Sequence, residues 1–144
     1  MTMIYGYICI GSYIDALDVF QGMQIVGIEP DKATVIFVLP LCAQLGALEI
    51  GIWIHMYCAR NGWLRRTCVS NALIEMYTKC GSIEQACQLF DQILERDVIS
   101  WSAMIGGLAN HGKAHEAIAI CERMKLRDVI LLFLFRNYWI LIEL

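Results

Sequence analysis

A pattern that opens with glycine occurs four times along this 144-residue chain. In each copy a small residue stands five positions after the glycine, and a residue of larger volume follows four positions later. The glycines are separated by 35, 35 and 31 residues, at Gly11, Gly46, Gly81 and Gly112. A period of roughly 20–50 residues is typical of solenoids, in which stacked units bury a continuous core. The chain is therefore predicted to be a short stack of similar units.

Each unit has the pattern of a helical hairpin. An apolar stretch ends at the glycine, which permits a tight turn, and an amphipathic stretch of about ten residues follows. The small residues are expected where two helices approach closely, at Ala16, Gly51, Ala86 and Ala117. The larger ones lie one turn further along the same face, at Phe20, His55, Phe90 and Cys121. Eight helices are predicted, near 2–10, 13–24, 33–45, 48–61, 68–79, 83–94, 98–110 and 114–125, the third kinked at Pro40. The fold class is all-α, an α-solenoid of helix–turn–helix repeats.

Composition narrows the functional classes. Apolar residues make up 58% of the chain and charged residues 17%, so much surface must be buried. The net charge of −3 lacks the basic excess that is typical of a nucleic-acid binder. The seven cysteines include no closely spaced pair and are expected to be reduced thiols rather than metal ligands. No targeting peptide is visible at the start of the chain.

The side chains around these glycines resemble a known family. The stretch Asn71-Ala-Leu-Ile-Glu-Met-Tyr-Thr-Lys-Cys-Gly-Ser-Ile-Glu-Gln-Ala, with Leu89-Phe-Asp and Glu95-Arg-Asp, resembles the short repeat of plant pentatricopeptide proteins. Val98-Ile-Ser-Trp-Ser-Ala-Met-Ile-Gly-Gly resembles the start of the next repeat, and 39–49 with Trp53 resembles the long variant. The family fold is a right-handed superhelix.

The resemblance divides the chain by repeat type. It implies an incomplete repeat at 1–31, a long repeat at 32–66, a short repeat at 67–97, the start of a standard repeat at 98–125 and a divergent apolar tail at 126–144. This order is similar to the mixed-length subclass, which works in mitochondria and chloroplasts of plants, largely in site-specific RNA editing.

The family binds single-stranded RNA, one base per repeat. By resemblance, the fifth and last residues of a repeat read the base, and apolar residues at the second position of successive repeats enclose it. In the short repeat these are Asn71 and Asp97, flanked by Cys68 and Ile99, a combination that resembles the pair favouring uracil, then cytosine. The alternative interpretation of Asn71 is a helix N-cap.

The remaining repeats carry incomplete reading pairs. Asp31 is a last-position residue whose fifth-position partner is Met1. Ser102 occupies a fifth position, but its partner position holds Leu132. The long repeat offers Ile36 and Arg66, which do not form a familiar pair. Four basic residues are candidates for phosphate contacts or for plain solvated charges: Arg65, Arg66, Lys79 and Lys113.

Catalysis is not expected of this chain. His111 and His115 have the spacing of a metal pair, but Gly112 places a turn between them and no third ligand follows. The zinc-deaminase pattern of some editing proteins is absent, so an editing role requires editing-factor partners that supply catalysis in trans. No cofactor, DNA partner or membrane span is predicted. The alternative function is a scaffold for protein partners.

The tail after Lys125 departs from the repeat pattern. Its apolar run is interrupted by Arg136 and Asn137 after seven residues, too short for a membrane span. It is expected to be a helix that caps the last hairpin, or sequence not selected to fold there. With the incomplete first repeat, it suggests a gene-model fragment or a truncated product without independent function.

Overall fold

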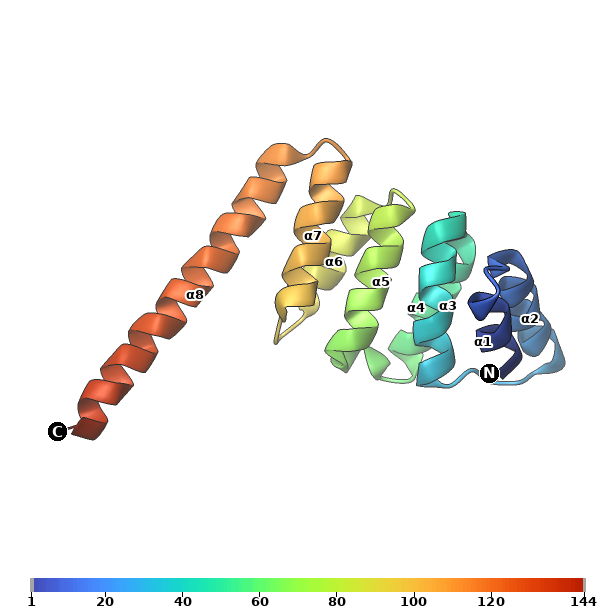
Figure 1. Cartoon of the computed structure of the whole chain (residues 1–144), viewed down its shortest axis with the longest axis horizontal. Coiled ribbons are helices and arrows are strands. Elements are labelled where there is room, and N and C mark those ends of the chain that lie inside the picture. Colours follow the sequence, from blue (N-terminus) through green and yellow to red (C-terminus); the bar gives the residue numbers. More distant parts are fainter. Residues whose placement is uncertain (1, 144) are drawn as a thin grey trace.

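A computed structural model describes the backbone of residues 2–143 and the side chains of residues 3–128. Within that range the chain forms eight α-helices and one short 3-10 helix (Figure 1). They are α1 (Thr2–Cys9), α2 (Tyr13–Val26), α3 (Lys32–Leu45), α4 (Leu48–Arg60), η1 (Trp63–Arg65), α5 (Thr67–Lys79), α6 (Ile83–Gln92), α7 (Val98–Asn110) and α8 (Ala114–Glu143). All eight predicted helices are present.

The helices pair as antiparallel hairpins, and the hairpins stack in chain order (Figure 1). Among the first helices, α5 packs directly on both α3 and α7. The second helix α4 packs on α3 and α5, and α6 packs on α5 and α7. Each helix from α2 to α7 thus contacts its own hairpin and a neighbouring one, which is the arrangement of an all-α helical-repeat solenoid.

The four repeat glycines close the hairpins in the same way. Their φ angles are 77°, 66°, 84° and 73° for Gly11, Gly46, Gly81 and Gly112, in the left-handed region that disfavours a side chain. The backbone N–H after each glycine donates to a carbonyl five residues back, at 2.8–2.9 Å. Such a bond satisfies one of the free carbonyls at a helix end. The glycine spacing therefore sets where every first helix ends.

The small positions of the repeat and two of its four large positions lie in the core, whereas His55 and Cys121 are half-buried. Ala16 and Ala86 are fully buried, Ala117 is 6% exposed, and Phe20 and Phe90 are buried with them. At Gly51 a Cβ atom would lie 2.4 Å from the Met76 Sδ, so an alanine there would require the Met76 side chain to move. The predicted packing is confirmed at the four small positions and at Phe20 and Phe90.

The last helix extends beyond its predicted end at residue 125. The helix α8 does not stop there but continues to Glu143, and its second half projects beyond the other hairpins (Figure 1). Residues 126–143 contain neither glycine nor proline, so no C-cap signal ends the helix. Of these residues only 126–128 have described side chains. Within the described part of the chain, no helix combines the length and the apolar character that a bilayer crossing needs.

Candidate nucleic-acid interface

Asn71 and Asp97 lie together at the junction of two repeats. Asn71 is the fifth residue of α5 and is 6% exposed, and Asp97 is the N-cap residue of α7. The Asn71 Nδ2 donates to the Asp97 Oδ1 at 3.0 Å. The N-cap interpretation of Asn71 is wrong, because Arg66 occupies the N-cap of α5. The packing of α5 on α7 therefore joins the fifth and last residues of one repeat.

The Asp97 carboxylate also begins α7. Its Oδ1 accepts from the backbone N–H of Ser100 at 2.9 Å, and the Asp97 N–H donates to the Ser100 Oγ at 3.2 Å. This capping box satisfies two N–H groups that a helix start would otherwise leave free. The hydrogen bond from the Ser100 N–H, followed by that from Asn71, lowers the pKa of Asp97. The carboxylate is thus held in its charged form.

Ser100 is a member of this site that the sequence analysis missed. Its Oγ lies 2.6 Å from the Asn71 Oδ1 and 2.9 Å from the Asp97 Oδ1, and the residue is fully buried. The signal available in the sequence was the spacing of Asp97 and Ser100. A good N-cap residue followed three positions later by a hydrogen-bonding side chain is typical of a capping box.

The flanking positions lie open beside this network. Cys68 is exposed, and the Ile99 side chain is 64% exposed. A groove of about 640 Å³ runs between α5 and α7, and Ile99 and Ser102 are among its lining residues. The other residues that line it are Glu75, Thr78, Lys79, Val98, Ala103, Gly106, Gly107, Asn110 and His111. The groove has the apolar side chains of Val98 and Ile99 at the start of α7, next to Asp97, and polar side chains further along α5 and α7.

The other predicted reading positions do not form a comparable pair. Asp31 caps α3, accepting from the Thr34 N–H at 2.8 Å and from its Oγ1 at 2.6 Å, while Met1 lies outside the described residues. Ser102 is exposed, and the Leu132 side chain lies outside the described range. Ile36 is half-buried, and Arg66 makes no capping bond. Of the predicted reading pairs, Asn71 with Asp97 is the only one joined by a hydrogen bond among the described residues.

Both lysines among the candidate phosphate-binding residues are paired with a nearby glutamate, Lys79 within α5 and Lys113 with the first turn of α8. Lys79 contacts Glu75 at 3.0 Å, and Lys113 contacts Glu116 at 3.5 Å. Arg65 and Arg66 are exposed beside η1. The basic side chains thus do not form one continuous positive surface along the groove.

The two histidines of the suspected metal pair lie at opposite ends of a turn. The His111 Nε2 is 2.5 Å from the Thr78 carbonyl oxygen and so ties the last turn to α5, whereas His115 is exposed. Among the side chains that the structure describes, no group of three potential ligands gathers around a metal-sized space.

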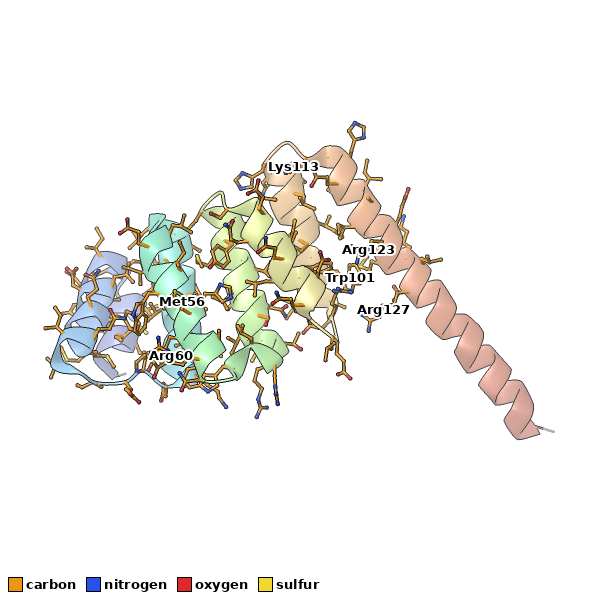
Figure 2. All side chains as sticks on the ribbon, turned by 180° about the vertical axis from the view of Figure 1, so that it is seen from behind. Met56, Arg60, Trp101, Lys113, Arg123 and Arg127 are labelled. Atoms are coloured by element: carbon orange, nitrogen blue, oxygen red, sulfur yellow. The ribbon has the colours of Figure 1, made fainter. Side chains whose placement is uncertain are left out.

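An arginine cluster lies on the other side of α7 (Figure 2). The Arg96 guanidinium covers the Phe90 and Trp101 rings, 4.5 and 5.6 Å from their centroids, and its Nε donates to the Phe90 carbonyl at 2.9 Å. Arg127 donates to the Arg96 carbonyl at 2.6 Å, and Arg123 lies 4.0 Å from Asp91. Burial, and then the charge of Arg123, lowers the pKa of Arg96. This cluster fastens α8 to the loop between α6 and α7.

Comparison with known proteins agrees with this architecture. The family model for the PPR repeat, the pentatricopeptide repeat, matches residues 1–28, 68–98 and 99–129, together more than half of the chain. The matched ranges leave out 29–67, where α3 and α4 nevertheless form a hairpin like the others.

Curated relatives come from Arabidopsis thaliana. The chain is 58% identical over 117 residues to the pentatricopeptide repeat-containing protein At2g20540, covering 81% of this chain and 22% of the relative. It is 42% identical over 126 residues to the chloroplastic protein At1g08070, covering 86% and 17%, and 43% identical over 108 residues to the mitochondrial protein At2g22410, covering 75% and 16%. The chain thus spans about a fifth of the length of these relatives. With helical hairpins at the family's period and family matches over most of its length, the chain belongs to the pentatricopeptide repeat family.

Proposed function

We propose that this chain binds single-stranded RNA in a plant organelle and that its short repeat, 67–97, contacts one pyrimidine base. The observation that supports this proposal is the hydrogen bond from Asn71 to Asp97 at the positions that the family resemblance assigns to base reading. Family members generally bind RNA and act in organellar RNA processing rather than catalysis. The named chloroplastic and mitochondrial relatives support an organellar location.

The chemistry of the pair suits a pyrimidine edge. An asparagine amide has two N–H donors and two acceptor lone pairs, and the bonds to Asp97 and Ser100 use one of each. One donor and one acceptor direction remain for a base. The Asp97 Oδ2 makes no hydrogen bond within the described part of the chain and can accept from a base or a bridging water. Cys68 and Ile99 supply apolar atoms for the two faces of the ring.

We further propose that the chain is a mixed-length array, with the repeat divisions 1–31, 32–66, 67–97, 98–125 and 126–144. In this role it positions an RNA for editing or another processing step, and partner proteins supply the chemistry. Asp31 and Ser102 contribute to neighbouring base positions. The array prefers RNA to DNA of the same sequence.

A scaffold for protein partners is the second candidate. It is favoured by the net charge of −3 and by large apolar side chains on the surface, such as Leu94 at 98% and Ile25 at 87% exposure. A phosphate-binding surface is expected to be positively charged. The two candidates therefore differ in whether the chain has affinity for RNA at all.

Fluorescence anisotropy with a labelled, uridine-rich single-stranded RNA separates these functions. The unmodified chain is expected to bind, and Asn71→Ala is expected to weaken binding, because the base loses its donor and acceptor. Asn61→Ala, at the C-cap of α4 and outside the pair, is the matched control and is expected to bind as the unmodified chain does. The same sequence as DNA should bind more weakly. Equal indifference of the chain to RNA, DNA and Asn71→Ala would favour the scaffold.

A further inference from the structure

Asn71, Asp97 and Ser100 form a closed ring of hydrogen bonds through their side chains and the Asp97 backbone N–H. Hydroxyl oxygens both donate and accept, but a serine has only one proton to give. The Ser100 Oγ is closer to the Asn71 Oδ1, at 2.6 Å, than to the Asp97 Oδ1, at 2.9 Å. Its proton therefore points to the amide oxygen, while its own oxygen accepts from the Asp97 N–H. Bonds that run in one direction around such a ring reinforce one another.

The ring fixes the order of donor and acceptor on the Asn71 amide. Asp97 only accepts, so the nitrogen end of the amide must face it. Ser100 then holds the oxygen end, and the residue is buried between α5 and α7. With both ends held, the amide cannot turn about its Cβ–Cγ bond without breaking two hydrogen bonds.

Uracil and cytosine differ in the order of donor and acceptor groups along the edge that faces the amide. Uracil presents a carbonyl acceptor beside its ring N–H donor, whereas cytosine presents an amino donor beside a ring nitrogen acceptor. An amide held in one orientation matches one of these edges. An amide that is free to turn can match both. The discrimination between the two bases thus depends on how firmly the amide is held.

On the basis of the proposed RNA-binding function, we propose that Ser100, the third residue of the following repeat, is a specificity-determining positioning residue for the base read by Asn71 and Asp97. It acts by holding the Asn71 amide oxygen rather than by contacting the base. The reading unit of this repeat is accordingly three residues from two hairpins.

The chain offers an internal comparison for this position. At the previous Asp-capped junction, Thr34 stands in the place of Ser100, is 2% exposed, and bonds to Asp31 through both its N–H and its Oγ1. A threonine hydroxyl therefore fits this buried position. At the junction that begins with Arg66, the corresponding residue is Val69, and no side-chain cap forms.

Three variants of the full chain test the proposal: Ser100→Ala, Ser100→Thr and Asn71→Ala. The measurement is the ratio of dissociation constants for two labelled RNA decamers, one of uridines and one with cytidines in their place. Ser100→Ala is expected to lower the preference for uridine about 3- to 10-fold, and Ser100→Thr is expected to restore it. Loss of the capping box alone would weaken both decamers equally and leave the ratio unchanged.

The NMR signals of the Asn71 side-chain amide give a readout without RNA. In the unmodified chain and in Ser100→Thr, its two Nδ2 protons are expected to exchange slowly with water, and in Ser100→Ala faster. Unchanged exchange in Ser100→Ala, or a base preference that needs Asn71 but ignores Ser100→Ala, would overturn the positioning role alone. Failure of the unmodified chain to bind either decamer would overturn the proposed function and the specificity role together.

Discussion

The Asn71 amide donates to the Asp97 carboxylate at 3.0 Å across 26 residues of sequence. The same carboxylate caps α7, so one side chain joins two repeats, begins a helix and completes the proposed base-reading pair. A structural bond and a proposed recognition element thus share their atoms. Substitutions at these positions are expected to affect the stability of the solenoid as well as any binding.

Removal of the Asp97 carboxylate is expected to lower the free energy of unfolding more than removal of the equivalent carboxylate at Asp31. Asp97→Ala loses the cap of α7 and the partner of a buried amide, so we expect a loss of about 1–2 kcal/mol in the free energy of unfolding. Asp31→Ala loses a cap on α3, with an expected cost of about 1 kcal/mol. Urea denaturation followed by circular dichroism measures both. Equal costs would show that the bond to Asn71 adds nothing.

Adjacent glycines in α7 are expected to respond to alanine in opposite ways. At Gly107 a Cβ would lie 2.4 Å from the Thr78 Cγ2 and 2.7 Å from its Cβ, so Gly107→Ala must push α7 away from α5. The expected cost is about 1–3 kcal/mol. At Gly106 nothing lies within 4 Å of such an atom. Gly106→Ala is therefore expected to stabilise the helix by about 0.5–1 kcal/mol.

Thermal and urea unfolding of the two glycine variants provides the test. Each serves as the other's control, because the substitution and the helix are the same. If Gly107→Ala matched the unmodified chain in stability, the close packing of α7 on α5 at Thr78 would be refuted.

Because the His55 imidazole is partly buried, the free energy of unfolding is expected to depend on pH. Its Nδ1 lies 2.8 Å from the Tyr77 hydroxyl, and burial lowers the pKa of His55 from its usual value near 6.5. The unfolded chain therefore takes up a proton more readily than the folded chain. The stability that this histidine contributes is fully present above about pH 6.5 and is lost as the pH falls through the folded-state pKa.

Urea midpoints measured between pH 7.5 and pH 5 would show this effect. His55→Phe, which matches Phe20 and Phe90 in the equivalent repeat positions, is expected to flatten the dependence over this range. His115→Phe, at an exposed histidine, is the control and should leave the dependence in place. An identical slope in His55→Phe and in the unmodified chain would contradict the prediction.

Replacement of Arg96 by lysine is expected to destabilise the fold. Its guanidinium covers the Phe90 ring and donates to the Phe90 carbonyl through Nε and to the Asp91 carbonyl through Nη2. A lysine has a single nitrogen and cannot make both bonds while lying flat on the ring. We expect Arg96→Lys to cost about 1–2 kcal/mol.

Arg127→Lys is the comparison for Arg96→Lys. Arg127 is exposed and makes one bond, to the Arg96 carbonyl, so its replacement should cost less than about 1 kcal/mol. Denaturation by urea ranks the two variants. A larger effect at Arg127 would mean that the attachment of α8, rather than the ring contact of Arg96, dominates this cluster.

Much of the fold could be predicted because its signals are local. A glycine with positive φ, a small residue five positions later and an apolar residue one turn further each act within a single hairpin, and they recur at Gly11, Gly46, Gly81 and Gly112. The predicted end of α8 was wrong, because it followed the repeat pattern and not a local stop signal. Without a glycine or a proline after Lys125, no local signal stops the helix, and it continues to Glu143.

The sequence by itself determined that this chain is a stack of helical hairpins and which residues close each turn, because those choices depend on residues a few positions apart. Only the tertiary structure decided how Asn71 is held. Its partners stand 26 and 29 residues away, and neither spacing is a property of a helix. They meet because α5 packs on α7, and the buried amide then requires hydrogen bonds that Asp97 and Ser100 alone are placed to make.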